Sequence, residues 1–335
     1  MHLKQIHIHY QEANIITGFE LHIQPGEIFV LMGPSGSGKT TLLKGIAGLV
    51  PIASGELCWE NGIGTVGMVF QEPRLFPHLT VLENIAFALR VKGVPRKERT
   101  EQASQFLKIM QLDGLEDRYP HQISGGQQQR VSLGRTLIQK PDLLLLDEPF
   151  ASLDTPLRLE LIDWLYHFQR ENRFSIIWVT HFLDEAFSVA DRIGIMIAGS
   201  LQQTGRPAEL YQKPFSEKIA AFLSLPNRFT REQWQKYFQC DLTSLPTKER
   251  GWIPANSLKF IDKRLILETR KEENPIGFIS GIVTKIIPGN GGFSVIVKSG
   301  DCLLEINSME WNTIPGLNKE VTIKIPFERI IWYHQ

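Results

Sequence analysis

The chain has 335 residues, of which 42% are hydrophobic and 21% charged, and its 36 basic and 36 acidic side chains give a formal net charge of zero. This length accommodates one large domain and one smaller domain. Zero net charge argues against bulk electrostatic attraction to DNA or RNA. The three cysteines lie far apart without a C-x-x-C pair, so they suggest neither a disulfide framework nor a zinc site, and a reducing cytosol fits them best. No apolar run approaches the roughly eighteen residues that a membrane-spanning helix needs.

The first predicted elements are strands. Leu3, Ile6 and Ile8 alternate with polar residues, as in a strand at the edge of a sheet. Tyr10 follows them; an aromatic in this place could stack on an adenine ring, although a tyrosine that ends a strand more often only packs. The residues from Ile28 to Met32 form a short apolar run that is typical of a buried strand.

One stretch after this run fits the phosphate-binding pattern G-x-x-x-x-G-K-[ST] at every fixed position: Gly33-Pro34-Ser35-Gly36-Ser37-Gly38-Lys39-Thr40. A loop of small residues can turn its backbone N–H groups toward the phosphates of a nucleoside triphosphate. Lys39 would reach the β- and γ-phosphates, and the Thr40 hydroxyl would bind Mg²⁺. A helix pattern follows, so the phosphates would lie at a helix N-terminus. A glycine-rich turn with an incidental lysine is the weaker alternative, because strand, loop and helix come in the required order.

The next segment predicts a strand pair around Gly55 to Trp59 and Thr65 to Phe70. Gln71 ends the second of these strands. From Val81 to Gln139 the spacing of apolar residues indicates helices.

Ser124-Gly125-Gly126-Gln127 opens one of these helices. A serine followed by two glycines at a helix start presents backbone donors that suit an anion. By itself this is a weak signal, since many helices begin in this way.

The run Leu143 to Leu146 predicts a parallel strand that is buried on both faces. It ends at Asp147 and Glu148, at the end of a strand where open α/β sheets place their ligands. Asp147 would hold Mg²⁺, directly or through water, and Glu148 would polarise the water that attacks the γ-phosphate. Acidic residues that merely cap the next helix would explain Glu148 but not the leucine run.

A further strand is predicted from Ile176 to Val179, and His181 follows it. A lone histidine after a strand is usually structural. One delivered to the same sheet edge as Lys39 and Glu148 could instead donate a hydrogen bond to the γ-phosphate.

Together these segments resemble the ATP-hydrolysing subunit of an ABC transporter over about residues 1–225. Gly33 to Thr41 match the Walker A motif and its following threonine, Gln71 the Q-loop, and Leu143 to Glu148 Walker B. The remaining matches are the LSGGQ motif at Ser124 to Gln127, with Ile123 in place of leucine, the D-loop at Ser152 to Asp154, the H-loop at His181 and the aromatic A-loop at Tyr10.

The resemblance implies a P-loop NTPase fold, with a RecA-like core, an antiparallel β-subdomain and an inserted helical subdomain at about residues 78–140. It also implies a head-to-tail homodimer in which Ser124, Gly125, Gly126 and Gln127 of one chain, with Asp154, contact the ATP held by the other chain. Gln71 would be a further Mg²⁺ ligand. The segment from Gln71 to Phe87 would line the groove that receives a membrane permease, at the cytoplasmic face of the inner membrane.

Residues 226–335 are predicted to form a second domain of short strands at Gly277 to Ile287, Phe293 to Val297, Cys302 to Ile306 and Val321 to Ile325. They resemble the small OB-like barrel, called TOBE, of importer ATPases, where it would be regulatory. The region 227–250 has a helix-like pattern and departs from those proteins.

The resemblance therefore favours an importer subunit that binds ATP and Mg²⁺ and meets a substrate-binding protein only indirectly. The transported substrate would be an oxyanion, iron(III) or a polyamine in preference to a sugar. The alternatives are the ATPase of a sugar importer or of an exporter, and an ABC ATPase that acts on nucleic acid. The last is disfavoured because no sustained heptads separate Thr40 from Ser124 and no basic, aromatic surface is evident.

Overall fold

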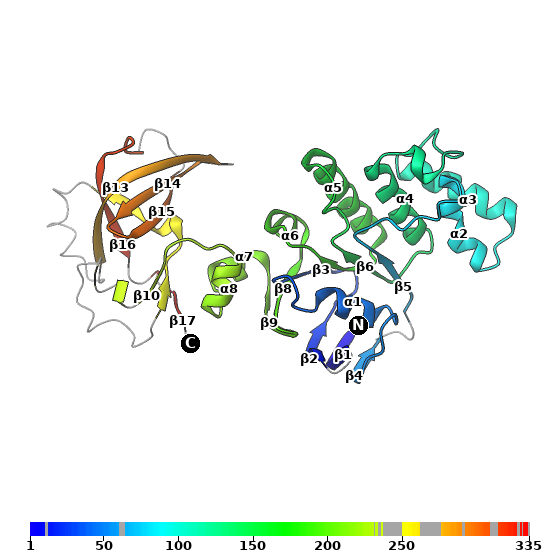
Figure 1. The fold of residues 1–335 in the computed structure, drawn as a ribbon, viewed down its shortest axis with the longest axis horizontal. Helices are drawn as coiled ribbons and strands as arrows, with labels where there is room; N and C mark the ends of the chain where they lie inside the picture. Colours follow the sequence, from blue (N-terminus) through cyan, green and yellow to red (C-terminus); the bar gives the residue numbers. More distant parts are fainter. Residues whose placement is uncertain are drawn as a thin grey trace. The chain divides into compact units, whose positions relative to one another are not determined.

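The computed structural model describes residues 1–10, 13–59, 64–230, 232–233, 236, 250–261, 276–289, 292–308, 314–326, 329 and 331–333. The chain divides into two compact units, Met1–Leu210 and Tyr211–Gln335 (Figure 1). In the described part of the chain, no helix is both long enough and apolar enough to cross a bilayer.

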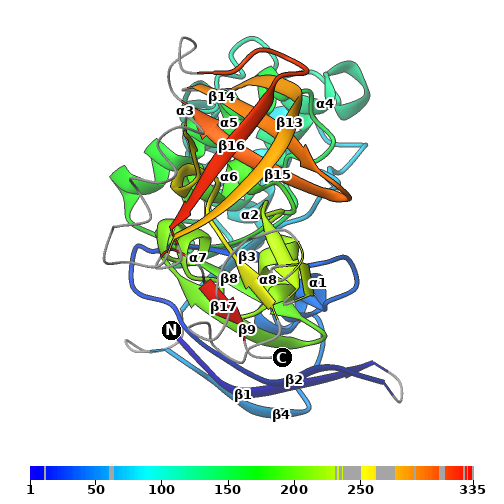
Figure 2. The same ribbon diagram turned by 90° about the vertical axis from the view of Figure 1, so that its left-hand side faces the viewer.

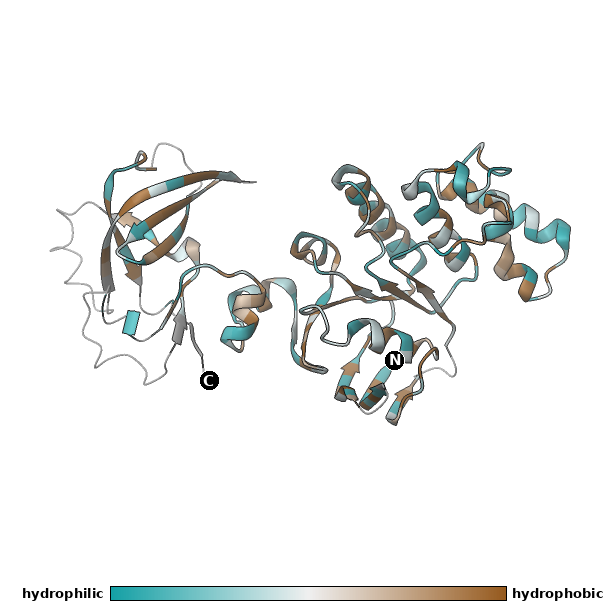
Figure 3. Ribbon diagram, in the orientation of Figure 1, coloured by the Kyte–Doolittle hydropathy of each residue, from teal (hydrophilic) through white to brown (hydrophobic). Residues whose placement is uncertain are grey.

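A six-stranded sheet forms the centre of the first unit, in the order β5-β6-β7-β3-β8-β9. All neighbouring pairs are parallel except β8 and β9. Every residue of β3 and β6 is buried, as expected for parallel strands covered on both faces; these strands are among the apolar segments of Figure 3. The bounds are β3 (Ile28–Met32), β5 (Val66–Val69), β6 (Leu143–Asp147), β7 (Ser175–Val179), β8 (Arg192–Ile197) and β9 (Ser200–Gly205).

A three-stranded antiparallel sheet accompanies it, in the order β2-β1-β4, with β1 (His2–Tyr10), β2 (Ala13–His22) and β4 (Ser54–Cys58). The prediction of an edge strand at the start of the chain was wrong, because β1 is the middle strand. Its alternation reflects one face packed into the core, where Leu3, Ile6 and Ile8 lie, and the polar face is exposed without being at an edge.

The predicted strand pair after helix α1 was also wrong. Both strands exist, but β4 pairs with β1 and β5 pairs with β6 in the other sheet. Sequential strands are neighbours only about two-thirds of the time, and each pattern here satisfies a different core.

Helices are present where the spacing of apolar residues predicted them, after the glycine loop and between residues 81 and 139. Helix α1 packs into the core that the two sheets share, and α2, α3 and α4 lie together as a separate group (Figure 1). Ile85 of α2 and Met110, just after α3, approach Gly134 of α4, where a side chain would meet both. The bounds are α1 (Lys39–Ile46), α2 (Val81–Val91), α3 (Arg96–Ile109), η1 (Pro120–Gln122), α4 (Gly125–Leu137), α5 (Thr155–Asn172), α6 (Leu183–Val189) and α7 (Pro207–Gln212), which crosses the boundary between the units.

The second unit contains a curved five-stranded antiparallel sheet in the order β12-β16-β13-β14-β15 (Figure 2). Alternate residues of its strands, among them Val295, Val297 and Leu304, fill one hydrophobic core. The four predicted strands are confirmed as β13 (Ile276–Gly289), β14 (Gly292–Ser299), β15 (Cys302–Ser308) and β16 (Glu320–Pro326).

Smaller elements complete this unit. A three-stranded sheet has the order β10-β11-β17. Of the region 227–250, for which the sequence predicted a helix-like pattern, the structure describes only residues 227–230, 232–233, 236 and 250; residues 228–230 form strand β10, and residue 250 begins β11. The bounds are α8 (Glu217–Phe222), β10 (Arg228–Thr230), β11 (Arg250–Trp252), η3 (Ala255–Ser257), β12 (Lys259–Ile261) and β17 (Ile331–Tyr333).

Candidate active site

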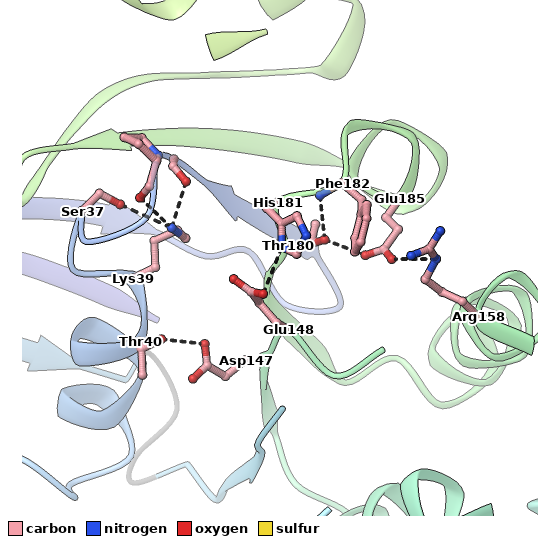
Figure 4. A network of polar contacts seen from close by, with 12 residues as sticks. Ser37, Lys39, Thr40, Asp147, Glu148, Arg158, Thr180, His181, Phe182 and Glu185 are labelled. Carbon is pink, nitrogen blue, oxygen red and sulfur yellow. Dashed lines mark hydrogen bonds and ion pairs between the residues drawn. The ribbon is translucent and has the colours of Figure 1, made fainter. Parts of the chain in front are cut away.

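The predicted catalytic residues follow three adjacent strands of the parallel sheet. Strand β3 leads into the glycine loop, β6 ends at Asp147, and β7 leads to His181. Because β6, β7 and β3 run parallel, their carboxyl ends meet at one edge of the sheet. Figure 4 shows the side chains that converge there.

The glycine loop places a lysine and a helix N-terminus together. Gly38 is the N-cap of α1 and has a φ of 100°, and a Cβ there would approach a methyl carbon of Ile16 within 2.7 Å. The Lys39 ammonium is buried and donates hydrogen bonds to the carbonyls of Gly33 at 2.9 Å and Pro34 at 3.0 Å. Burial lowers the pKa of Lys39, against the opposing influence of Glu148 and Asp147. No side chain caps α1 and no acidic residue lies in its first turn, which keeps this end suited to an anion.

Thr40 and Asp147 form the first polar pair. The Thr40 hydroxyl donates to Oδ1 of Asp147 at 2.9 Å, which joins α1 to the end of β6. The Asp147 side chain is buried, and burial raises its pKa, although the hydrogen bond from Thr40 and the charges of Lys44 and Lys39 act in the opposite direction.

Glu148 and His181 form the second pair. Their Oε2 and Nδ1 atoms are 2.9 Å apart, and the backbone N–H of Glu148 donates to the carbonyl of Val179, the last residue of β7. Glu148 has a φ of 48°, in the left-handed region that a residue with a side chain rarely adopts. Such local strain is typical of functional positions.

A buried network next to His181 was not predicted from the sequence. Thr180 donates to Oε2 of Glu185 at 2.6 Å, and Nε of Arg158 lies 3.5 Å from Oε1 of the same carboxylate. Desolvation raises the pKa of Glu185, against the effects of Thr180 and Arg158. The only sequence signal was a glutamate on the apolar face of a short helix.

Other predicted residues lie apart from these pairs. Ser124 accepts a hydrogen bond from the N–H of Gln127 at 3.3 Å, and Gln127 Oε1 accepts from the N–H of Ser124 at 2.9 Å, so their recorded bonds stay within the start of α4. A Cβ on Gly126 would lie 2.2 Å from a methyl carbon of Leu157, whereas Gly125 faces open space.

Three further predicted residues are exposed or lie outside what is described. The side chain of Gln71 is exposed just after β5, and Asp154 is an exposed N-cap of α5 without a side-chain capping bond. Tyr10 ends β1, but its side chain lies outside the described residues. The roles of all these residues stay predictions.

The fold and the paired groups at the sheet edge define a P-loop ATPase. A model of the ABC transporter family matches residues 16–151. A sulfate/thiosulfate import ATP-binding protein of Halalkalibacterium halodurans is 40% identical over 269 residues, 76% of this chain and 73% of that protein. An Fe(3+) ions import ATP-binding protein of Fusobacterium nucleatum is 42% identical over 226 residues (65% and 61%), and a maltose/maltodextrin import ATP-binding protein of Yersinia pestis is 39% identical over 269 residues (75% and 71%).

Among solved structures, a dimeric post-hydrolysis state of the ATP-binding cassette MJ0796 with ADP and Pi is 30% identical. It aligns with a TM-score of 0.55 over 62% of this chain and 98% of that one. The chain belongs to the ABC transporter family, and it is the ATP-hydrolysing subunit of an importer.

We expect the Asp147→Asn variant to be more stable than the wild type at neutral pH in the absence of nucleotide. The folded protein raises the pKa of Asp147 above its value in the unfolded chain, so the ionised carboxylate opposes folding and asparagine removes that cost. The gain should be complete above the folded-state pKa of Asp147 and shrink as the pH falls through it, because the wild-type carboxyl then becomes neutral. Thermal unfolding at several pH values measures this, and a variant that is less stable throughout would contradict it.

Proposed function

We propose that two copies of this chain bind two ATP molecules between them, head to tail. Each ATP would contact residues 33–41 of one chain and residues 124–127 of the other. Three observations support this arrangement: the recorded bonds of Ser124 and Gln127 stay within α4, Gly125 faces open space, and the similar cassette MJ0796 is described as dimeric. Asp154, exposed at the start of α5, would lie at the same junction, and Tyr10 would stack on the adenine.

Within one chain, the glycine loop would hold the phosphates. The N–H groups at the start of α1 point along the helix axis toward them, and Lys39 would exchange its bonds to the Gly33 and Pro34 carbonyls for bonds to the β- and γ-phosphates. This exchange lowers the cost of keeping an ammonium group buried, since phosphate oxygens carry more negative charge than carbonyls.

The residues at Thr40 and Asp147 fit Mg²⁺. Their two oxygens already lie 2.9 Å apart, and hydroxyl and carboxylate oxygens are ligands that this hard cation prefers. No cluster of three or more His, Cys, Asp or Glu side chains that could hold a metal occurs among the described residues, so the phosphates and water would complete the site. Gln71, which is exposed just after the end of β5, would be a further ligand of the ion. The ion would offset phosphate charge.

Hydrolysis would use the second pair. Glu148 would accept a proton from the water whose oxygen attacks the γ-phosphorus, while the bond from this phosphorus to the β–γ bridging oxygen breaks and ADP and phosphate are released. His181 would orient Glu148 and donate a hydrogen bond to the γ-phosphate. The single observation that carries this proposal is the Glu148–His181 contact of 2.9 Å beside the Thr40–Asp147 contact, at one sheet edge.

The permease would contact the segment from Gln71 to Phe87 at the cytoplasmic face of the membrane. The buried amide of Asn84 fixes this segment by hydrogen bonds to the N–H and carbonyl of Phe76 and to the carbonyls of Leu79 and Thr80. Such a braced loop can transmit the movement of an ATP-driven dimer. The second unit would be regulatory, and the substrate-binding protein would act through the permease.

The substrate would be an oxyanion or iron(III), with a polyamine and a sugar as the other candidates. The relatives named for sulfate/thiosulfate and for Fe(3+) favour the first two, and the relative named for maltose keeps a sugar open. In vesicles that contain this chain with its cognate permease and binding protein, we expect ATP-dependent uptake of radiolabelled sulfate or iron(III) and none of maltose. Uptake of maltose alone would contradict this.

The Glu148→Gln variant should bind ATP within about twofold of wild type but turn it over about a hundredfold more slowly or worse, the scale for loss of a general base. Phosphate release and equilibrium binding of a fluorescent ATP analogue measure the two quantities. Glu171→Gln, a change of the same kind at an exposed position on α5, is the control and should leave both unchanged. Near-normal hydrolysis by Glu148→Gln would remove this residue from the role.

The Ser124→Arg and Lys39→Ala variants should each be inactive alone and recover activity when mixed. In a mixed dimer one site keeps an intact loop and an intact Ser124, so an equal mixture should reach about a quarter of the wild-type rate per chain, since half of the dimers are mixed and half of their sites work. ATPase assays after equilibration measure this. An absence of recovery in mixtures that do form dimers would exclude shared sites.

A further inference from the structure

The imidazole of His181 is largely exposed and makes few contacts with the described residues. It is 51% exposed, and within the described residues its recorded contacts are the hydrogen bond to Glu148 and the neighbouring ring of Phe182, with ring centroids 4.0 Å apart. An exposed side chain on a turn would sample several rotamers unless the turn itself were fixed. The backbone on both sides of His181 sets the position from which the ring extends, and the contacts with Glu148 and Phe182 then select its rotamer.

Thr180 fixes that backbone. Its side chain is buried, its hydroxyl donates to Oε2 of Glu185 at 2.6 Å, and the same oxygen accepts the N–H of Phe182 at 3.1 Å. The hydroxyl thus bonds across His181 to the next residue, and the carboxylate of Glu185 anchors it to helix α6. Figure 4 shows this sequence of contacts.

Arg158 closes the network from helix α5. Its Nε lies 3.5 Å from Oε1 of Glu185, and its guanidinium carbon lies 4.2 Å from the centre of the Phe182 ring. Phe182 therefore lies between the guanidinium and the imidazole of His181. The N–H of Arg158 donates to the carbonyl of Asp154, so this residue belongs to the first turn of α5.

The network has an unfavourable desolvation free energy, because Glu185 is only 5% exposed and its carboxylate has lost most of its hydration. A well-packed apolar pair would be at least as stabilising in many proteins. The arrangement has a feature that an apolar pair would lack: the Glu185 carboxylate accepts a directional hydrogen bond from Thr180 while it pairs with Arg158, so it orients the segment after β7 against the segment after β6. Those segments carry Glu148 and His181.

We propose that Arg158 and Glu185 are positioning residues for ATP hydrolysis, which hold the 180–182 turn so that His181 faces Glu148. In this role they act through Thr180 and Phe182 and not by direct contact with the nucleotide or the attacking water. The inference rests on the proposed roles of Glu148 and His181. A displacement of about 1 Å in such groups is enough to slow a reaction by up to about a hundredfold.

The test compares turnover with nucleotide affinity in the full-length protein. Arg158→Met keeps the length of the stem over Phe182 and removes the charge; it should lower kcat about tenfold and leave the Kd of a fluorescent ATP analogue within about twofold. Glu185→Gln should do the same. The double variant should fall about tenfold and not about a hundredfold, because both changes break one contact. Arg158→Lys, which keeps the charge, should recover most of the rate.

Arg170→Met is the matched control. Arg170 lies on the same helix and forms an ion pair with Asp191 at 2.8 Å, which in turn accepts the N–H of Ile28 at the start of β3, away from the catalytic edge. Its kcat should stay within about twofold of wild type. Circular dichroism melting checks that each variant is folded, and Thr180→Val, which removes both hydroxyl bonds, replaces Arg158→Met if the latter does not fold.

The outcomes separate the two proposals. Unchanged kcat in Arg158→Met, additive losses in the double variant, or an equal loss in Arg170→Met would each overturn the positioning role while Glu148→Gln remains inactive. Loss of nucleotide affinity in step with kcat would overturn it as well. If Glu148→Gln hydrolyses ATP at the wild-type rate, the proposed function itself fails, and the positioning role fails with it.

Discussion

The site depends on the parallel alignment of three buried strands. In the register of β6 and β7, Leu146 pairs with Trp178 and Asp147 with Val179, so the chain leaves both strands at the same level. Strand β3 pairs with the other side of β7 and delivers the glycine loop to that edge. Successive residues of a strand point to opposite faces, so a slip of one residue in β6 would turn Asp147 to the other face of the sheet. The leucines of β6 therefore hold the carboxylates in register as well as filling the core.

The same edge brings together several charged groups that are buried in the protein, Lys39, Asp147 and Glu185. Burial lowers the pKa of Lys39 and raises those of Asp147 and Glu185, in each case against the charged form. Each group is partly compensated, by loop carbonyls, by Thr40 or by Thr180 with Arg158. The positive φ of Glu148 adds backbone strain. A site of this kind is a net cost to folding that the apolar core of the two sheets offsets, and it keeps the charged groups ready for a polyanionic ligand.

Local patterns in the sequence predicted the elements well and their neighbours poorly. The leucine run, the glycine loop and the capping serine each depend on nearby residues, so strand β6 and the starts of α1 and α4 were predicted close to where the structure has them. The placing of β1 in the middle of a sheet and the separation of β4 from β5 depend on pairing between distant segments, which periodicity does not encode. Arg158 and Glu185 were missed for the same reason: they are 27 residues apart and meet only because β7 lies beside β6. The proximity of Thr40 and Asp147 could be predicted, because each belongs to a local sequence motif that indicates a Mg²⁺ ligand.

Helix α4 connects residues 124–127, which are proposed to contact the ATP of the other chain, to the segment after β5. Its N-cap is Ser124, and farther along the helix Gln129 donates to the carbonyl of Phe70 at 3.4 Å, on one side of Gln71. Arg135 donates to the carbonyls of Pro73 and Arg74 at 3.2 and 3.0 Å, on the other side. Thirteen residues of helix span about 20 Å, so one continuous element joins the glycines at its start to these carbonyls. Arg135 bonds to backbone carbonyls, and these remain when the side chain of residue 73 or 74 is replaced. The connection therefore constrains the path of the backbone after Gln71 and does not depend on which side chains follow it.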